Sequence, residues 1–405
     1  MSGTLEGRLR DLLGAGALER TRDGRPRALP PDVERLAALL ALAGAEGWRV
    51  RIEGSGSWLP ADAPADLVVG TRALDAVVRV DAADLVCTVQ GGVPLDALHR
   101  RLARERMWLA LDPPGRPTRT LGAIAATATG GPLRLGYGPV RDHVLGVTVV
   151  TGDGQVVKPG GRVVKNVAGY DLTKLCVGGF GAFGVLAELH LRLRALPPED
   201  RTFVARGARD HLTSAARDLA DAGLDAQALE LVSPAAGAGA DWVLAARLLG
   251  TAEGVAAEGA RLGLGTDLAW EALPAERAGQ FWALVQGAPL AGRVALRFGV
   301  LRDGLDDLLD TLDASLGEGI VTAGAASGQV RWSGEADGAQ VAALRHALAP
   351  REVPVTLERA PRAVLAAAGH FGAYREGVGA LVARLRQVFD PRGTLAVEAD
   401  GAPHG

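Results

Sequence analysis

The sequence predicts an α+β protein built from two domains, and three observations support this prediction. Between residues 29 and 111, helix-like and strand-like segments alternate at the spacing expected for a mixed sheet with helices packed on it. The proline pair in Leu196-Pro-Pro198 interrupts this pattern and is typical of a domain boundary. After it, four strand-like segments alternate with helix-like ones, which favours an antiparallel, ferredoxin-like domain. We therefore expect one domain over residues 28–198 and a second over residues 199–405.

The first domain begins with a predicted helix over residues 29–47. Prolines stand at its start, acidic residues follow in its first turn, and Gly47 comes after its end. The strand Trp48–Ile52 follows and runs into a turn of small residues, Glu53-Gly-Ser-Gly-Ser57. The other elements expected before residue 112 are a helix from Pro94 to about Arg106 and strands over Asp66–Val69, Ala76–Val80, Leu85–Gln90 and Trp108–Leu111.

The small-residue turn and a second glycine-rich stretch, Asp112–Gly131, could each bind an anion or could be ordinary structure. Backbone amides in Gly54-Ser-Gly-Ser57 can form a concave nest for phosphate, although most Gly/Ser turns are only turns. In the second stretch, Thr120 is expected to cap a short helix of mostly small residues over Leu121–Thr127. Such a helix packs closely against whatever lies beside it, whether a ligand or the sheet.

A third stretch contains Gly179, Gly181 and Gly184 in the order G-x-G-x-x-G. In a Rossmann fold this motif follows a strand and opens a helix. Here the order is reversed, because Tyr170–Val177 is helix-like and a strand-like alternation begins at Val185 and continues to residue 194. The Rossmann interpretation is therefore excluded. The glycines could line a cavity with backbone, or could simply end a helix and begin a bulged strand.

The second domain is predicted to be ferredoxin-like because helices separate its strands, and no tandem repeat is visible in it. Arg293 and Arg297 lie on one face of an expected strand and could bind a carboxylate, although a solvent-facing or ion-paired role is more common for such residues. The strands expected are Trp242–Ala246, Arg293–Val300, Gln329–Ser333 and Val353–Glu358, and the helices are residues 251–263, 304–316 and 336–349 and Val378–Phe389.

Composition excludes several classes of function. A formal charge of −3 over 405 residues gives no electrostatic footprint for nucleic acid. No apolar run approaches the ~20 residues of a membrane span, and the start of the chain lacks the apolar region of a signal peptide. Cys87 and Cys176 lie far apart, without metal-binding spacing. These features predict a reduced, cytoplasmic protein without a membrane span of its own.

The order of the glycine-rich stretches resembles the FAD-binding domain of the vanillyl-alcohol oxidase/PCMH family. After the small-residue turn come T-L-G-A-x-A-A-T from Thr120, R-L-G-Y-G from Arg134, and K-N-V-A-G-Y-D within Val164–Asp171. The resemblance covers residues 28–198 and is greatest to the FAD-binding subunit of glycolate oxidase. It implies a PCMH-type FAD-binding domain of two α/β subdomains, followed by a cap-like second domain.

The end of the chain also resembles this family. Phe389-Asp-Pro-Arg-Gly-Thr-Leu is similar to the family's C-terminal element, which implies that the last helix returns to the FAD-binding domain. The similarity then stops, because Ala396-Val-Glu398 stands where the family usually has N-P-G.

The resemblance implies a non-covalent FAD. Some members attach the flavin to a His or Cys, but the turn here carries serines, and Cys87 is expected in a strand elsewhere. The resemblance assigns to FAD the pyrophosphate-loop residues Gly54, Ser55, Gly56, Ser57 and Trp58, the flavin and ribityl wall Pro113, Thr120, Leu121, Gly122, Thr127 and Gly130, and Gly184 and Val185 at the adenosine end.

The catalytic residues are not identified by the sequence. Relatives that oxidise 2-hydroxy acids carry a histidine-rich motif, H-x-x-D-x-N-x-H in outline, and no two histidines here repeat it. His346 on a predicted helix and His370 in a Gly-Ala loop are interpreted as solvated or packing residues, and no metal site is predicted. The substrate, the physiological electron acceptor and the oligomeric state are likewise left open.

The sequence is compatible with two main functions and with a third, less favoured function. The resemblance implies a subunit of a glycolate oxidase-like complex that oxidises a small 2-hydroxy acid to a 2-oxo acid. It would act beside a larger FAD-linked oxidase paralogue and an iron–sulfur subunit, through which it would reach the membrane. The alternatives are a stand-alone FAD-dependent oxidoreductase on an unidentified small substrate and a non-catalytic assembly subunit. The chain lacks four-cysteine cluster spacing, so any iron–sulfur centre must belong to another chain.

Overall fold

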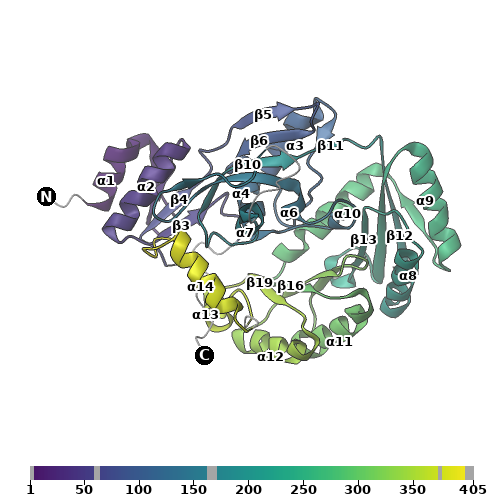
Figure 1. The fold of residues 1–405 in the computed structure, drawn as a ribbon. Helices are drawn as coiled ribbons and strands as arrows, with labels where there is room; N and C mark the ends of the chain where they lie inside the picture. Colours follow the sequence, from purple (N-terminus) through teal and green to yellow (C-terminus); the bar gives the residue numbers. More distant parts are fainter. Residues whose placement is uncertain (1–3, 59–63, 162–170, 373–375, 397–405) are drawn as a thin grey trace.

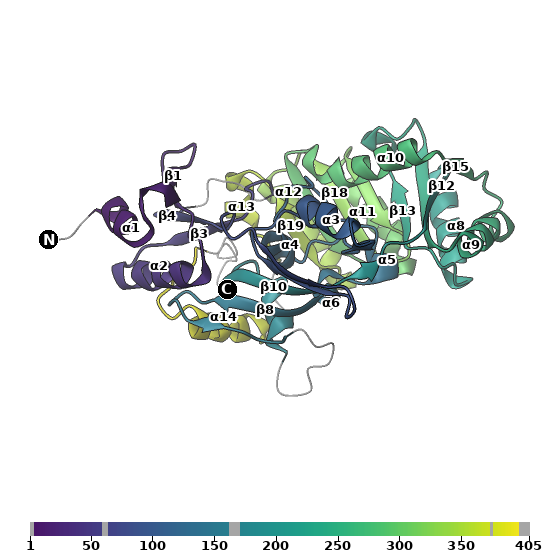
Figure 2. The same cartoon turned by 90° about the horizontal axis from the view of Figure 1, so that it is seen from above.

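The computed structural model describes residues 4–58, 64–161, 171–372 and 376–396. Three sheet-bearing parts follow one another along an elongated molecule (Figure 1). A small sheet near the N-terminus is followed by a five-stranded sheet, and the eight-stranded sheet extends from below the five-stranded sheet to the far end of the molecule. The same succession is visible from above (Figure 2). The predicted α+β class is confirmed.

The first sheet has the strand order β1-β2-β4-β3, with β4 parallel to both β2 and β3. Its main helix, α2, begins at Asp32, whose side chain accepts a hydrogen bond from the Arg35 amide, and ends at the left-handed Gly47. Apolar side chains of α2, including Leu36, Leu39 and Leu40, form the core against the sheet. The elements are α1 (Leu5–Leu13), β1 (Leu18–Arg20), β2 (Pro26–Ala28), α2 (Val33–Glu46), β3 (Val50–Glu53) and β4 (Leu67–Gly70).

The second sheet is antiparallel throughout, in the order β5-β6-β10-β8-β9. Its strands are β5 (Val77–Asp81), β6 (Val86–Gln90), β8 (Val144–Val150), β9 (Val156–Val157) and β10 (Val185–Arg192), and its helices are α3 (Leu95–Ala103), α4 (Leu121–Thr127), α5 (Arg134–Tyr137), α6 (Val140–His143) and α7 (Leu172–Cys176). The glycines at 178–184 therefore do end a helix and begin a strand, as predicted.

One predicted strand is much shorter than expected. Only Met107–Trp108 of the region around Trp108–Leu111 forms a strand, β7, which pairs with β11 (Arg194–Ala195). Residues 109–111 continue as a buried loop whose apolar side chains belong to the core. A run of hydrophobic residues indicates burial, and because a strand and a buried loop are both buried, the run alone does not distinguish them.

The eight-stranded sheet contains twice as many strands as the four predicted. Its order is β15-β12-β14-β13-β17-β18-β16-β19, and every neighbouring pair is antiparallel. The strands are β12 (Glu199–Gly207), β13 (Ala228–Val232), β14 (Trp242–Gly250), β15 (Glu271–Leu273), β16 (Val294–Gly299), β17 (Ile320–Gly324), β18 (Gln329–Gly334) and β19 (Val355–Arg359).

This sheet consists of two ferredoxin-like units placed side by side. Each unit runs strand–helix–strand–strand–helix–strand, and in each the first and third strands are central. The units join where β13 pairs with β17. The ferredoxin-like prediction is thus confirmed but doubled. The helices of the units are α8 (Arg209–Asp221), α9 (Ala252–Gly265), α11 (Leu305–Leu316) and α12 (Gly338–Leu348), and α10 (Ala275–Gly287) connects the units.

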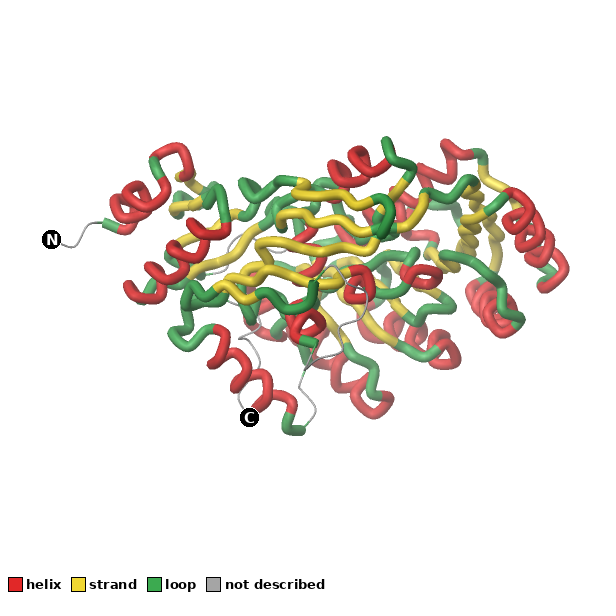
Figure 3. Tube along the Cα trace, turned by 45° about the horizontal axis from the view of Figure 1, so that its top comes forward, coloured by secondary structure: helices red, strands yellow, loops and turns green. Residues whose placement is uncertain are grey.

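The two faces of the second unit have different partners. On β16 and β18, Leu296, Phe298 and Trp332 belong to the core formed with the helices. The intervening residues Arg297 and Arg331 point the other way, because neighbouring side chains alternate between the faces of a strand. They hydrogen-bond to residues 128–130, which follow α4 in the part of the chain that carries the second sheet. Helices lie along the outer side of this sheet (Figure 3).

The chain finally returns to the first sheet. After α13 (Arg362–Ala368), helix α14 (Val378–Phe389) packs Phe389 against Phe183, with ring centroids 5.5 Å apart. Leu395 then forms a bridge beside Val50 of β3. In Figure 1, α14 (yellow) lies next to the N-terminal part of the molecule.

The motif Val164–Asp171 lies outside the described residues apart from Asp171, whose side chain caps α7 by accepting from the Lys174 amide. Within the described part of the chain, no helix combines the length and apolar character needed to cross a membrane.

Candidate cofactor site

A cavity lies between the first and second sheets and reaches the C-terminal part of the chain. It encloses about 1140 Å³, part of which is open to solvent. Its wall is formed by Arg51, Ile52, Glu53, Gly54, Ser55, Gly56, Ser57, Trp58, Thr71, Arg119, Gly122, Ala123, Ala126, Thr127, Phe180, Gly181, Gly184, Val185, Leu186, His370, Leu395 and Ala396.

The turn after β3 supplies the polar backbone of this cavity. Gly56 has φ +64°, a conformation that glycine adopts without steric cost. Gly54 lies directly against Thr120, and a Cβ at this position would collide with the threonine hydroxyl. The turn and the start of α4 are therefore packed together, with backbone rather than side chains next to the cavity.

Glycines also bring the opposite wall close. A Cβ on Gly122 would lie 2.8 Å from the Gly91 carbonyl oxygen. Gly184 has φ +127°, and a Cβ there would lie 2.5 Å from the Val150 carbonyl oxygen. These positions can hold only glycine, because the start of β10 and α4 pack against neighbouring backbone.

The charges beside the turn are partly compensated within the protein. Glu53 accepts from Arg27 at 2.7 Å and from Arg51 at 3.0 Å. Deeper in the wall, Arg119 is 1% exposed, and its guanidinium carbon lies 4.4 Å from the centre of the Trp58 ring. The cavity therefore has cationic groups close to its glycine-rich turn.

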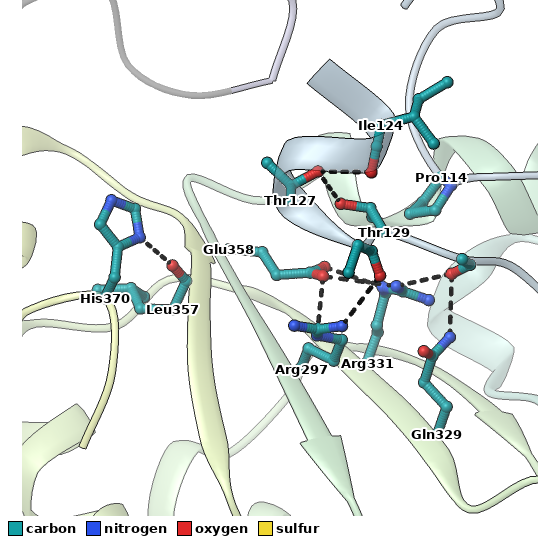
Figure 4. Close-up of polar contacts among 12 residues, drawn as sticks. Pro114, Ile124, Thr127, Thr129, Arg297, Gln329, Arg331, Leu357, Glu358 and His370 are labelled. Carbon is teal, nitrogen blue, oxygen red and sulfur yellow. Dashed lines mark hydrogen bonds and ion pairs between the residues drawn. The ribbon is translucent and has the colours of Figure 1, made fainter. Parts of the chain in front are cut away.

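A buried ion cluster of the eight-stranded sheet lies outside the cavity wall and contacts the segment that follows α4. The Glu358 carboxylate, 2% exposed, accepts from Arg331 Nε at 2.9 Å and pairs with Arg297 Nε at 3.1 Å (Figure 4). Burial opposes ionisation of Glu358, but the arginines outweigh it and lower its pKa. Arg331 Nη2 and Gln329 Nε2 donate to the Gly130 carbonyl at 2.9 and 3.0 Å. The second ferredoxin-like unit thereby holds the glycine-rich segment.

His370 is a wall residue that the sequence did not identify. It is 1% exposed, and its Nδ1 lies 2.7 Å from the Leu357 carbonyl oxygen (Figure 4). A carbonyl only accepts, so Nδ1 carries the proton and Nε2 is the basic nitrogen of the neutral ring. Among the described wall residues it is the only histidine. Of the two alternatives given for His370, its burial contradicts the solvated one and agrees with the packing one.

Two further acids are buried near the junction. Burial raises the pKa of Asp112 to about 7 and that of Glu230 to about 8. Asp112 accepts hydrogen bonds from the Leu133 amide at 3.1 Å. Both carboxyl groups are therefore protonated more readily than ordinary acids.

The structure brings most of the predicted FAD positions together. The following lie in one wall: Gly54, Ser55, Gly56, Ser57, Trp58, Gly122, Thr127, Gly184 and Val185. Four others lie outside it. Thr120 caps α4, Leu121 is in the core, Pro113 is in a buried loop, and the Gly130 carbonyl is bound by Arg331 and Gln329.

The arginines Arg293 and Arg297 differ from each other. Arg297 is paired with Glu358, so the ion-paired alternative is confirmed for it. Arg293 precedes β16, is largely exposed and lies 3.9 Å from Glu335.

The cysteines are poor nucleophiles in this structure. Burial raises the pKa of Cys87 to about 12 and that of Cys176 to about 11. Neither thiol is in the cavity wall. In the described part of the chain, no group of three or more His, Cys, Asp or Glu residues could hold a metal ion.

Comparison with known proteins identifies the N-terminal part. Residues 27–160 match the FAD binding domain. D-2-hydroxyglutarate dehydrogenase of Xanthomonas citri pv. viticola is 34% identical over 174 residues, covering 42% of this chain and 37% of the relative. Glycolate oxidase subunit GlcE of Escherichia coli K12 is 39% identical over 122 residues, covering 30% and 35%. The matches thus span only about a third of these relatives' length.

Solved structures show the fold over nearly the whole chain. p-Cresol methylhydroxylase with bound substrate superposes with a TM-score of 0.78 at 13% identity, covering 98% of this chain and 96% of that one. Alkyldihydroxyacetonephosphate synthase gives a TM-score of 0.75 at 13% identity, covering 98% and 85%.

The cavity has the features that an FAD dinucleotide requires. Backbone of the turn at Gly54–Trp58 is available to the phosphates, and main chain at Gly122 and Gly184, packed closely against neighbouring backbone, also lines the cavity. FAD is the cofactor of this domain. Residues 27–160 therefore form an FAD binding domain, and the fold of the chain is similar to that of p-cresol methylhydroxylase.

Proposed function

We propose that this protein is an FAD-dependent oxidoreductase that oxidises a small 2-hydroxy acid to a 2-oxo acid, as a subunit of a glycolate oxidase-like complex. The observation that carries the proposal is the FAD cavity with a buried histidine, His370, in its C-terminal wall. Bound FAD would accept the electrons, and a base of the protein would take the substrate's hydroxyl proton. His370 Nε2 is our candidate for this base.

The substrate class rests on the relatives. Their names include glycolate oxidase subunits, D-2-hydroxyglutarate dehydrogenase and, in Archaeoglobus fulgidus, D-lactate dehydrogenase. The acids in these names share a hydroxyl group next to a carboxylate. We therefore assign the class of 2-hydroxy acids and leave the individual acid to experiment.

The subunit role rests on similarity to two differently named subunits, GlcE of Escherichia coli and GlcD of Bacillus subtilis. In this proposal the partners are a larger FAD-linked oxidase and an iron–sulfur subunit. The chain works in the cytoplasm, and any membrane contact belongs to its partners.

A specific observation favours a second candidate, a non-catalytic assembly subunit that still binds FAD. Pro113 and Gly130 were predicted to face the flavin. Both lie outside the cavity wall, and the Gly130 carbonyl is already bound by Arg331 and Gln329. Such a subunit would retain the cofactor without oxidising substrate.

Dye-linked oxidation of glycolate, D-lactate and D-2-hydroxyglutarate separates these functions. The purified chain is expected to be yellow, to oxidise these acids slowly alone, and to become active with its two partners. A His370→Gln variant should retain FAD but lose the stimulated activity, whereas His346→Gln, at an exposed position on α12, should match the wild type.

Each other outcome contradicts a defined part of the proposal. Rapid turnover by the isolated chain would establish the stand-alone enzyme instead. Stimulation that survives in the His370→Gln variant would show that the base lies elsewhere. Partner activity that requires this chain but not its flavin would establish the assembly role.

A further inference from the structure

Arg119 is a buried cation without an acidic partner. Its side chain is 1% exposed, and among the described residues no carboxylate forms an ion pair with it. Nη1 donates to the Pro114 carbonyl at 2.7 Å, and Nη2 donates to the Thr127 and Thr129 hydroxyls at 3.2 and 3.4 Å. All of these acceptors are neutral. Nε is also buried and has no hydrogen-bond acceptor.

Such an arrangement is unfavourable in the protein without a ligand. An arginine removed from water loses its hydration, and neutral acceptors replace only part of it. Burial accordingly lowers the pKa of Arg119 to about 9. Glu358 acts on Arg119 electrostatically, but its carboxylate is already paired with Arg297 and Arg331.

The side chain is nevertheless held in one position. Its guanidinium carbon lies 4.4 Å from the centre of the Trp58 ring, and Trp58 is the last described residue of the turn that begins at Gly54. Gly115, with φ +100°, lies against both side chains, because a Cβ there would be 3.0 Å from the Trp58 ring and 3.1 Å from the Arg119 Cδ. Arg119 and the turn residues Gly54–Trp58 line the same cavity.

The other arginine of the described wall already has a carboxylate partner. Arg51 is bonded to Glu53, which is also bonded to Arg27. Within the described wall, Arg119 is therefore the arginine whose charge is left without a carboxylate. An anion in the cavity would supply the missing partner.

We propose that Arg119 is the cofactor-positioning residue of this site and that it neutralises the pyrophosphate of FAD. The turn would bind the phosphate oxygens through backbone amides, while the fixed guanidinium supplies the charge that the amides lack. The inference rests on the FAD site of the proposed function and does not depend on the oxidation of any substrate.

Three variants of the full chain, freed of flavin, test the inference by titration with FAD, ADP and riboflavin. Arg119→Met keeps the length of the side chain and removes the charge, and Arg119→Lys keeps the charge without the planar fork. Arg116→Met is the matched control, because Arg116 is an exposed arginine of the same loop.

Arg119→Met should weaken the binding of FAD and ADP by about tenfold or more, the range of a lost charge-assisted hydrogen bond. Riboflavin, which has no phosphate, should bind as to the wild type. Arg119→Lys should be intermediate and Arg116→Met unchanged. The melting temperature of the flavin-free Arg119→Met protein should equal or exceed that of the wild type, because an uncompensated buried charge has been removed.

Four results would overturn the inference. FAD and ADP affinities of Arg119→Met within about twofold of the wild type would show that the charge does not act on the cofactor. Loss of riboflavin binding with unchanged ADP binding would assign the charge to the flavin ring instead. A lower melting temperature with normal FAD affinity would make Arg119 a structural residue. A wild-type chain that binds neither FAD nor ADP would overturn the proposed function as well, which distinguishes that failure from the others.

Discussion

Replacing Glu358 by glutamine is expected to destabilise the protein strongly. The carboxylate is 2% exposed and serves two cations, Arg331 at 2.9 Å and Arg297 at 3.1 Å. Glutamine keeps the shape but leaves both guanidinium groups buried without a counter-charge. Removing one partner of a buried ion pair costs about 3–5 kcal/mol, and we expect a loss in that range from the free energy of unfolding.

Urea denaturation measured by tryptophan fluorescence gives this quantity. With slopes of about 3 kcal/mol per molar urea for a large domain, the midpoint should fall by roughly 1 M or more. The pH dependence has a defined sign, because the pKa of Glu358 is lowered from its ordinary 4.5. Its stabilisation is present above pH 4.5 and is lost as the pH falls through the lowered pKa, so the two proteins should converge in acid.

Two controls make the result specific. Glu335→Gln removes an exposed carboxylate 3.9 Å from Arg293 and should change the free energy of unfolding by less than about 1 kcal/mol. A triple variant with Arg297, Arg331 and Glu358 all replaced by Met or Leu should recover much of the loss, because no unpaired charge remains. A loss below about 1 kcal/mol for Glu358→Gln would refute the idea that this buried ion cluster stabilises the folded protein.

Three further predictions concern the cofactor and the buried acids. Gly56→Asp should abolish FAD retention, because its Cβ would lie 3.0 Å from Glu53 and its carboxylate would repel phosphate. Gly223→Asp is the control, because Gly223 has an equally left-handed backbone in open space and the variant should retain flavin. Flavin absorbance of the purified proteins measures both. Glu230→Gln should change the pH profile of the denaturation midpoint. Because the pKa of Glu230 is raised, its own contribution to stability is greatest below pH 4.5 and falls as the pH rises to about 8, so a variant no more stable than wild type at pH 8.5 would contradict this assignment. FAD should be released completely by acid precipitation, because burial raises the pKa of Cys87 to about 12 and disfavours its thiolate; yellow precipitate would indicate covalent attachment.

Local sequence signals predicted those parts of the site that depend on neighbouring residues. The turn at Gly54–Trp58 and the Thr120-capped helix follow from glycine conformation and capping, and both are present. The presence of a second ferredoxin-like unit could not be recognised from the sequence. β13 is buried at all five positions and so lacks the alternation that marks a half-exposed strand.

Residues brought in by the tertiary fold could not be predicted. Arg119 looks like a surface charge in a polar loop, and only the packing of Trp58 and Gly115 around it shows its burial. His370 reaches the cavity because residues after β19 return past Phe180, a contact between distant parts of the chain. The contacts of Gly130 also depend on the tertiary fold, because Arg331 and Gln329 from the eight-stranded sheet donate to its carbonyl.

The pairing of β13 with β17 makes the C-terminal domain equivalent to a homodimer whose two copies have been joined into one chain. The fourth residue of each strand, Leu231 and Ala323, face each other, as equivalent residues do across a two-fold axis. Separate identical copies would have to carry the same residues on both sides. Covalent joining removes that constraint, and the two units differ. The second presents Arg297 and Arg331 to the glycine-rich segment, while the first covers its corresponding face with Phe281 and Trp282 of α10.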